Sequence, residues 1–443
     1  MRRPSLTLPL QAYRAGLWVG EPALSGLLAW RAQRGKEDPR RLPERRGLPG
    51  RARPVGPLVW MHGASVGEVL SLIGLVEGMI ARGFSVLVTT GTRAAADLIG
   101  ARLPVGAVHQ YMPLDAPRWM ARFLDHWQPN LAVVAESEIW PNMILALDAR
   151  EIPLILVNGR MSERSFHGWE RCPRTAKALL SRIAICLSQT QEDGARFAKL
   201  GAPRVSVSGN LKFDAPVPPA DPQQLAYLGT MVAGRPIWIA ASTHPGEESV
   251  IAYAHALLKE RFPNLLTIIA PRHPARAEEV VACASTLGLR SARRSTGGRP
   301  HPSVDVYVAD TIGELGLFYR LSALGFLGGS LVPRGGQNPI EPVRLDTAVL
   351  HGPHVGNFDA VYQALDRAGG AVPVQDGVEL AAVAGELLAD PARLATMARA
   401  GQNALKPFEG AVARTLAVLD PFVAQMKLQR LDRGSRLRPL ARA

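Results

Sequence analysis

Cysteine is scarce in this sequence, and its three cysteines form no pattern that would bind a metal or build a disulfide framework. Cys172, Cys186 and Cys283 are scattered through 443 residues, without CxxC or Cys/His spacing. Such usage is typical of proteins in a reducing compartment and argues against a structural zinc site. We therefore expect neither disulfides nor a bound metal.

Two common nucleotide-binding motifs are also missing. No GxxxxGK[ST] segment occurs, and no GxGxxG follows the first expected strand, so neither a phosphate-binding P-loop nor an NAD site is indicated. Aromatic residues make up only 6% of the chain, whereas proteins that bind single-stranded nucleic acid stack bases on aromatic side chains. A nucleic-acid-binding protein, the class that a net charge of +13 first suggests, is therefore disfavoured.

The N-terminal region has no long uncharged apolar run. Its most apolar stretch, residues 6–30, is interrupted by Arg14, Glu21 and Pro22, whereas a membrane-spanning helix needs about 20 mostly apolar residues. A basic run follows at 31–53. The pattern favours an amphipathic or hairpin segment that lies in a membrane interface. A helix that packs on the protein itself is the alternative interpretation.

The positive charge is concentrated at the two ends of the chain. Residues 1–53 carry 12 Lys and Arg against 4 Asp and Glu, and residues 427–443 carry 6 against 1. The long middle is therefore neutral. Basic ends on a neutral body favour contact with an anionic membrane surface, where each charge contributes about 1 kcal/mol. For the C-terminal end, a solubility tail without a partner is the alternative.

The length and the apolar pattern together predict two α/β domains. From residue 58, continuous apolar runs alternate with helical stretches, as parallel strands buried on both faces do. The expected strands include 85–89, 131–135, 154–157, 183–187 and 205–208 in the first half, and 237–241, 265–270, 304–309, 323–327 and 348–351 in the second. A proline-rich break at 214–222 separates the halves.

These patterns divide the chain into five parts. We expect a membrane-associating segment at 1–53, a first α/β domain at 54–213, a linker at 214–235, a second α/β domain at 236–408, and a C-terminal helix with a basic tail at 409–443. Within the last part, residues 409–426 are expected to pack on the first half.

A turn rich in small residues follows the first apolar run. Gly63, Ala64, Ser65 and Gly67 surround the turn, and Glu68 stands where the next helix should begin. Ligands of parallel sheets bind at the carboxyl ends of strands, and helix-start N–H groups can hold an anion. Glu68 adds a group that can accept a proton. The alternative is a tight turn whose glutamate is favoured by the helix dipole alone.

Other expected strands also end in polar or small residues. In the first half these segments are 136–142, 158–165 and 209–214, and in the second half they are 242–248, 271–274, 310–314 and 328–341. Each has an ordinary structural explanation when taken alone: Asn338 and Glu341 match a capping box, Glu136 or Glu138 can be an ion-pair partner, and Lys212 can be a solvated loop charge. Four such turns in the second half nevertheless favour a nucleotide site at one sheet edge.

Taken together, these segments resemble the 3-deoxy-D-manno-octulosonic acid (Kdo) transferases of lipopolysaccharide synthesis. The similar stretches occur in the family's order, at 62–68, 136–142, 158–165, 209–214, 242–248, 271–274, 328–341 and 352–358. One position departs from the pattern, because Gln337 stands where the family often has His.

The resemblance implies a glycosyltransferase of the GT-B type, with two Rossmann-like, doubly wound domains that face each other across a cleft. The donor would be CMP-Kdo and the acceptor the lipid A precursor, a tetraacylated glucosamine disaccharide bisphosphate (lipid IVA). Transfer would invert the anomeric carbon at the cytoplasmic face of the inner membrane, with the protein peripheral or anchored by its N-terminus. No metal and no other cofactor is expected.

The resemblance also implies roles for individual residues. Glu68 would be the general base, and Glu138 and Lys212 would support the transition state. Contacts with CMP would come from Pro271, Arg272, His273, Ile312, Gly313, Glu314, Asn338, Pro339, Ile340 and Glu341. Further contacts with donor or acceptor are expected at Ser65, Gly67, Arg160, Arg164, Ser242, Thr243 and Ser330.

Three other functions compete with this interpretation. The chain can be another GT-B glycosyltransferase that uses a different nucleotide sugar, such as a UDP-sugar. It can also be a basic nucleic-acid-binding protein, or a non-catalytic adaptor at a membrane surface in which Glu68 has no chemical role.

Overall fold

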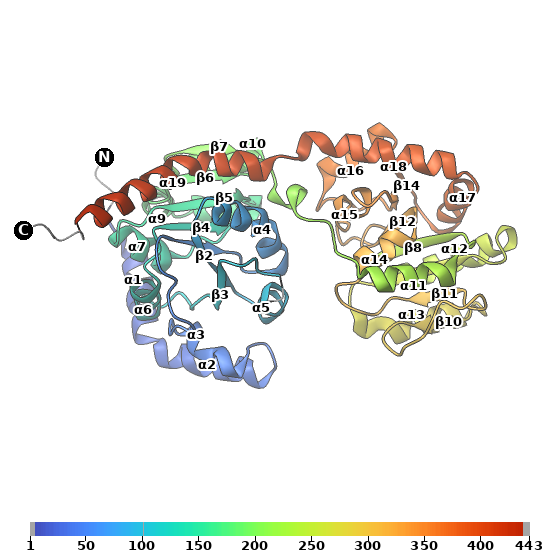
Figure 1. Ribbon diagram of the computed structural model, residues 1–443, viewed down its shortest axis with the longest axis horizontal. Coiled ribbons are helices and arrows are strands. Elements are labelled where there is room, and N and C mark those ends of the chain that lie inside the picture. The colour runs from blue at the N-terminus through green and yellow to red at the C-terminus, as the bar shows by residue number, and fades with distance from the viewer. Residues whose placement is uncertain (1–4, 101, 437–443) are drawn as a thin grey trace, which may run out of the picture. The chain divides into compact units, whose positions relative to one another are not determined.

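The computed structural model describes residues 5–100 and 102–436, and the chain forms two α/β domains. The first domain runs to Ala215 and takes up the chain again at Phe408, while the second covers Pro216–Pro407 (Figure 1). The chain therefore leaves the first domain once and returns to it. The prediction of two doubly wound α/β domains is confirmed by the sheets described next.

The first domain is built on a seven-stranded parallel sheet in the order β3-β2-β1-β4-β5-β6-β7. The chain starts at β1, proceeds outward to β3, and then returns to the other side of β1 with β4. Ligands bind at such a reversal, where neighbouring loops diverge. The strands are β1 (Leu58–His62), β2 (Ser85–Thr90), β3 (Ala107–Tyr111), β4 (Leu131–Ala135), β5 (Leu154–Gly159), β6 (Ile185–Ser188) and β7 (Val205–Val207).

Helices cover both faces of this sheet. They are α4 (Val66–Ala81), α5 (Arg93–Gly100), α6 (Pro117–Trp127), α7 (Pro141–Ala149), α8 (Glu163–Glu170), α9 (Pro173–Leu180), α10 (Gln191–Lys199), the short η2 (Leu211–Asp214) and the long C-terminal α19 (Ala411–Arg436). Before β1 the chain forms α1 (Leu8–Val19), α2 (Glu21–Gln33), η1 (Pro39–Arg41) and α3 (Leu42–Arg45).

The second domain repeats the same plan. Its parallel sheet has the order β10-β11-β9-β8-β12-β13-β14. The strands are β8 (Ile237–Thr243), β9 (Leu266–Pro271), β10 (Ser291–Arg293), β11 (Val306–Val308), β12 (Leu324–Leu327), β13 (Ala348–His351) and β14 (Ala371–Pro373). The helices are α11 (Pro222–Val232), α12 (Glu247–Arg261), η3 (Pro274–Arg276), α13 (Ala277–Ser285), α14 (Leu315–Leu321), α15 (Ile340–Val343), α16 (Asp359–Ala368), α17 (Gly377–Leu388), α18 (Pro391–Leu405) and η4 (Lys406–Phe408).

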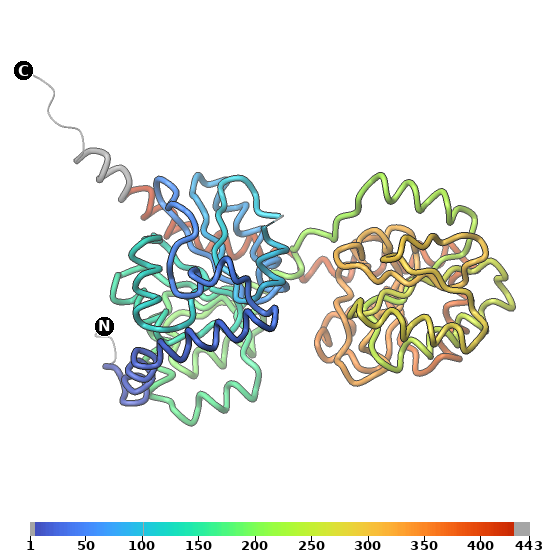
Figure 2. The backbone as a smooth tube through the Cα atoms, turned by 90° about the horizontal axis from the view of Figure 1, so that it is seen from below, coloured from blue at the N-terminus to red at the C-terminus, as the bar shows by residue number. Residues whose placement is uncertain are grey.

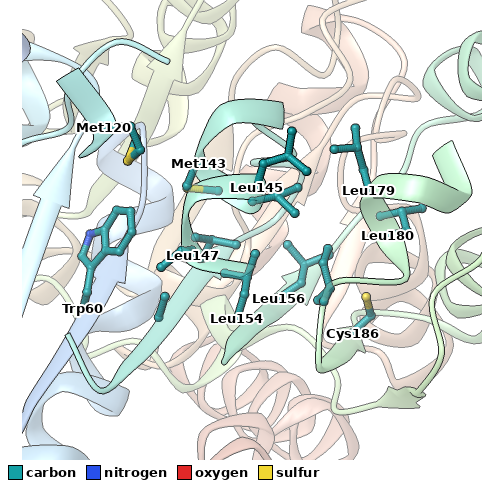
Figure 3. Close-up of a cluster of buried hydrophobic side chains, with 14 of the residues drawn as sticks. Trp60, Met120, Met143, Leu145, Leu147, Leu154, Leu156, Leu179, Leu180 and Cys186 are labelled. Atoms are coloured by element: carbon teal, nitrogen blue, oxygen red, sulfur yellow. The ribbon is translucent and has the colours of Figure 1, made fainter. Parts of the chain in front are cut away.

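Burial on both faces explains why the central strands are continuous apolar runs. In β1, Leu58 and Trp60 belong to one core cluster, and Val59 and Met61 belong to another. Figure 3 shows Trp60 in the first cluster, together with side chains of α6, α7 and α9. Because successive side chains of a strand point to opposite faces, a polar residue at any of these four positions would be buried.

The sequence prediction missed three strands, β3, β10 and β14. Each lies at an edge of its sheet, where only one neighbour pairs with it. Their sequences, Ala-Val-His-Gln-Tyr, Ser-Ala-Arg and Ala-Val-Pro, contain no long apolar run. Since the prediction relied on continuous apolar runs, it identified central strands more readily than edges.

The stretch 214–235, expected as a linker, contains a helix of the second domain. Pro222–Val232 forms α11, which packs on α14. The backbone before it lies so close to α14 that a methyl group at Gly316 would lie 2.3 Å from the carbonyl oxygen of Pro218. At the other end of the chain, α19 packs on α4 of the first domain, with Val412 beside Gly74.

Residues before β1 are integrated into the first domain. Leu10 of α1 and Leu28 of α2 are buried, and Figure 2 shows both helices, in blue, against this domain. Part of the basic run that was predicted to face a membrane forms ion pairs within this domain. Glu37 pairs with Arg31 at 2.8 Å and with Arg45 at 3.4 Å.

No helix among the described residues is both long and apolar enough to cross a bilayer. Residues 437–443, the end of the predicted basic tail, lie outside the described residues, so their role stays a prediction.

Candidate functional site

The carboxyl ends of β1 and β4 carry the first group of predicted site residues. Glu68 lies in the first turn of α4, which follows β1, and the segment Glu136–Trp140 follows β4. These two strands are neighbours at the reversal of the sheet order. The fold therefore places both segments at the edge where parallel sheets bind ligands.

Ser65 and Glu68 form a variant of the capping box at the start of α4, in which the glutamate binds the Ala64 N–H and the Ser65 hydroxyl instead of the Ser65 N–H. The Ser65 hydroxyl accepts a hydrogen bond from the Glu68 backbone N–H at 3.4 Å and donates one to Glu68 Oε1 at 2.7 Å. Glu68 Oε2 accepts a bond from the Ala64 N–H at 2.8 Å. These contacts fix the carboxylate, which is half-buried, above the turn. Each carboxylate oxygen retains a further lone pair.

Gly63 lets the end of β1 approach this turn. A methyl group at Gly63 would lie 2.8 Å from the Val69 nitrogen and 3.0 Å from the Glu68 carbonyl carbon. Only glycine fits there without moving the backbone that carries Glu68. At Gly67 the nearest atom to an added methyl is Lys212 Cε at 3.8 Å, which is an ordinary contact.

Lys212 forms an ion pair with Glu136. The Lys212 Nζ lies 2.8 Å from Glu136 Oε1, and the Lys212 side chain passes the first turn of α4 beside Gly67. Glu136 has a left-handed backbone, with φ of 55°, a conformation that costs a non-glycine residue about 1–3 kcal/mol and is common at functional sites. The pairing that was considered as a structural alternative for Glu136 is therefore present, and it joins two predicted site segments.

Asn158 at the end of β5 holds the backbone next to Lys212. Its Oδ1 accepts a hydrogen bond from the Leu211 N–H at 3.0 Å, and its own φ is 52°. Arg160 and Arg164, which follow on the same segment, are exposed. Both guanidinium groups are thus accessible at the carboxyl edge of the sheet.

Glu138 is held by His62 and Trp140. Its Oε2 lies 3.3 Å from His62 Nε2 and accepts a hydrogen bond from the Trp140 indole. Burial by itself raises the pKa of Glu138, but the hydrogen bond and charge of His62, together with Trp140, outweigh burial and hold the pKa below its ordinary value. Glu138 is consequently ionised at neutral pH and presents a negative charge at the site.

In the second domain, the two side-chain hydroxyls that were predicted to contact a phosphate differ in solvent exposure. Thr243 is fully buried and its hydroxyl donates to Glu248 Oε1 at 2.9 Å. Ser242 is half-buried and has a φ of 56°. Of the two, Ser242 is the one with access to solvent.

The ends of β9 and β11 carry the next predicted CMP contacts. Arg272 and His273 are exposed after the buried Pro271. Ile312 is 85% exposed. Glu314 binds Arg294 at 2.7 Å, and this guanidinium holds the pKa of Glu314 below its usual range.

One buried carboxylate binds the backbone of the glycine-rich segment after β12. Glu247 is fully buried. Its Oε2 accepts hydrogen bonds from the His244 and Gly329 N–H groups at 2.9 and 2.7 Å, and its Oε1 accepts those of Ser330 and Leu331 at 3.1 and 3.0 Å. The N–H groups of residues 329–331 are therefore already bonded inside the protein.

The predicted contacts around α15 are partly structural. Ser330 is fully buried, and its hydroxyl donates to the Leu327 carbonyl. Asn338 Oδ1 accepts the Ile340 N–H at 3.1 Å, and Asn338 Nδ2 donates to Glu341 Oε1 at 3.3 Å. Pro339 and Ile340 are buried. Gln337, where the resemblance led us to expect a histidine, lies with its Nε2 3.2 Å from His244 Nε2.

Among residues 5–100 and 102–436, no group of three His, Cys, Asp or Glu side chains could hold a metal ion.

Comparison with known proteins identifies the family. Residues 40–215 match the family described as 3-deoxy-D-manno-octulosonic-acid transferase (kdotransferase). Over 407 residues the chain is 35% identical to the 3-deoxy-D-manno-octulosonic acid transferase of Haemophilus influenzae, covering 90% of this chain and 94% of the relative. The corresponding protein of Bordetella pertussis is 37% identical over 397 residues, with 86% and 91% covered. The chain belongs to the Kdo transferase family.

Solved structures support the fold. A putative UDP-N-acetylglucosamine 2-epimerase from Listeria monocytogenes aligns with a TM-score of 0.56 at 15% identity, covering 83% of this chain and 97% of the other. At this identity the likeness concerns the fold alone, and it confirms the GT-B class expected for a Kdo transferase. Family membership makes the chain a glycosyltransferase that transfers Kdo.

Sequence reasoning did not assign roles to His62, Thr89, Glu247 or Arg294. Their contacts join distant parts of the sequence: His62 bonds Glu138 across 76 positions, Thr89 bonds His62 across 27, and Glu247 bonds Ser330 across 83. The available signal was position: His62 is the last residue of β1, and Glu247 is the first residue of the helix that follows β8.

Replacing Gly63 by alanine should destabilise the Kdo transferase. The added methyl would contact the backbone of α4 and displace Glu68, and overpacking of this kind typically costs about 1–3 kcal/mol. Thermal unfolding of Gly63→Ala should therefore begin at lower temperature. Gly67→Ala is the matched control, because its methyl meets no close atom, and its melting temperature should not fall. Equal melting temperatures for Gly63→Ala and wild type would contradict the close approach described here.

Proposed function

We propose that this Kdo transferase moves Kdo from CMP-Kdo to the lipid A precursor in a single displacement that inverts the anomeric carbon. Family membership supports the transferred sugar. The observation that carries the proposal is the placement of Glu68, Glu138 and the Glu136–Lys212 pair at one edge of the first sheet. This edge offers one carboxylate as base and a second as a fixed negative charge.

In the proposed reaction, Glu68 removes the proton from an acceptor hydroxyl. The hydroxyl oxygen bonds to the anomeric carbon of Kdo while the bond from that carbon to the CMP phosphate oxygen breaks. The transition state resembles an oxocarbenium ion, so the ionised Glu138 stabilises its positive charge. The proton ends on Glu68 and the electron pair of the broken bond leaves with CMP.

The negative charge that develops on CMP needs positive partners. Exposed Arg272 and His273 are suited to this role, as are N–H groups at helix starts, and Lys212 supplies a further cation. The proposed chemistry therefore requires no metal. Because the N–H groups of residues 329–331 bind Glu247, we assign that segment a shaping role and give the phosphate contacts to the side chains and helix-start N–H groups named above.

We also propose that the first domain binds an anionic membrane surface through α1 and α2. These helices expose large apolar side chains: Leu8, Trp18, Val19, Leu27 and Trp30. An arginine guanidinium lies over each of the two exposed indoles: Arg118 is 4.3 Å from the Trp18 ring, and Arg34 is 4.0 Å from the Trp30 ring. Tryptophan beside a basic group suits the headgroup region of a bilayer. A surface contact of this kind would bring the site to its lipid acceptor.

Substitution of Glu68 by glutamine should reduce transfer by about 10²–10⁴-fold, the usual contribution of a general base. Glutamine can preserve the capping box, so stability should hardly change. The measurement is mass spectrometry of the glycolipid formed from CMP-Kdo and lipid A precursor. Glu77→Gln, an exposed position on the same helix, is the control and should retain full activity. Undiminished transfer by Glu68→Gln would remove Glu68 as the base.

The donor nucleotide can be tested without the acceptor. Calorimetric titration should show that the protein binds CMP more tightly than UMP, and Arg272→Ala should weaken CMP binding by about tenfold, as expected for loss of a charge-assisted contact. Arg290→Ala, at an exposed arginine before β10, is the control. Tighter binding of UMP would instead favour a UDP-sugar as donor.

Removing the two exposed indoles should weaken membrane binding. The double variant Trp18→Ser/Trp30→Ser should bind vesicles that contain phosphatidylglycerol at least about tenfold more weakly, because less apolar surface can enter the interface. Vesicle sedimentation measures this. Tyr253→Ser, at an equally exposed aromatic side chain of the second domain, is the control. Unchanged binding of the double variant would exclude α1 and α2 as the contact surface.

A further inference from the structure

Two hydrogen-bond donors converge on a single oxygen of Glu138. His62 Nε2 lies 3.3 Å from Oε2, and the Trp140 indole donates to the same atom. The other oxygen, Oε1, accepts no hydrogen bond from any residue that the structure describes. One side of the carboxylate is therefore occupied by the protein, and the other is available to a bound molecule.

His62 is itself held firmly. Its side chain is only 1% exposed, and its Nδ1 lies 2.9 Å from the Thr89 hydroxyl and 3.0 Å from the Thr89 carbonyl oxygen. The Trp60 indole N–H donates to the same hydroxyl at 2.8 Å. Because an indole N–H can only donate, the Thr89 hydroxyl accepts from Trp60, and its own hydrogen can point at His62 Nδ1, with Met112 Sδ as a second acceptor 3.9 Å away.

These contacts determine where the histidine carries a proton. If Nδ1 accepts from the Thr89 hydroxyl, the ring proton is on Nε2 and points at Glu138. If Nδ1 donates to the Thr89 carbonyl, Nε2 must also be protonated, since otherwise two acceptors would face each other at 3.3 Å. In both cases Nε2–H donates to Glu138 Oε2.

We propose that His62 is a positioning residue for the reaction: it holds Glu138 ionised and oriented, so that Oε1 faces the sugar that is being transferred. The chain of bonds runs from Trp60 through Thr89 and His62 to Glu138, and Trp140 supplies the second donor. This inference rests on the role proposed above for Glu138, and it adds a residue to which no role had been assigned.

The electrostatics of the pair agree with this role. Burial acts to raise the pKa of Glu138, and the hydrogen bond and charge of His62 act most strongly in the opposite direction, with Trp140 adding to them. Glu136, two residues before Glu138 in the sequence, is itself paired with Lys212 at 2.8 Å. Loss of the His62 donor should therefore raise the pKa of Glu138 and misalign its carboxylate.

The test compares His62→Leu with His62→Gln in full-length protein, using CMP-Kdo and lipid A precursor. Leucine removes the donor, and we expect kcat to fall by about tenfold to a hundredfold, the scale of a small misplacement of a reacting group. The acid limb of the kcat profile should also move to higher pH, while KM for CMP-Kdo stays unchanged. Glutamine can place an amide N–H near the position of Nε2, so His62→Gln should recover most of kcat and restore the acid limb.

Two outcomes would overturn the inference: a wild-type profile for His62→Leu, or equal damage in both His62 variants without a shift of the acid limb. Trp140→Phe provides a second test if His62→Leu does not fold, because Trp140 is 44% exposed. It removes the other donor to Oε2 and should shift the acid limb in the same direction, and an unshifted limb would contradict the proposal.

Glu138→Gln separates this inference from the proposed function. If Glu138→Gln transfers Kdo at the wild-type rate, the role of Glu138 fails. If Glu138→Gln is inactive while His62→Leu is normal, only the positioning role of His62 fails.

Discussion

Glu247 accepts four backbone hydrogen bonds, and the glycine-rich segment of the second domain depends on them. A fully buried carboxylate is costly unless its lone pairs are used, and here the N–H groups of His244, Gly329, Ser330 and Leu331 use them. The same bonds satisfy N–H groups that would otherwise be left unpaired where β12 ends. The N–H groups of this segment are thus already bonded within the protein, and phosphate recognition is left to other groups.

In the first domain, two further carboxylates accept backbone hydrogen bonds: that of the buried Asp115 and that of the half-buried Asp214. Asp115 accepts the N–H groups of Asn142 and Met143 at 3.0 and 2.8 Å and so fixes the start of α7, directly after Trp140. Burial raises the pKa of Asp115 to about 6 in spite of these donors. Asp214, two residues after Lys212, accepts hydrogen bonds from the N–H groups of Gly410 and Val412 at 2.7 and 2.6 Å and so anchors the start of α19. Carboxylates that bind backbone therefore flank the side chains available for chemistry.

How far the sequence predicts this structure depends on whether a signal is local. Continuous apolar runs such as Leu131–Ala135 identified the central strands because both faces of those strands are buried. Three of the four edge strands lack that signal, as Ser291–Arg293 illustrates. At the site, Glu68 was recognisable from its neighbours in sequence, whereas the role of His62 depends on Thr89 and Glu138, 27 and 76 positions away. Contacts of that range follow from the order of strands in the sheet and from no local pattern.

The two interpretations of Glu68 are compatible, because a capping box occupies only part of a carboxylate. Glu68 accepts one bond at each oxygen, from the Ala64 N–H and the Ser65 hydroxyl, and each oxygen keeps another lone pair. When Glu68 takes up a proton, the Ser65 hydroxyl can rotate and accept instead of donate, so the turn need not move. Glu138 differs, since both donors share one oxygen and stabilise the anion throughout. A carboxylate whose partner can reverse its hydrogen bond suits proton transfer, and one held by fixed donors suits a constant charge.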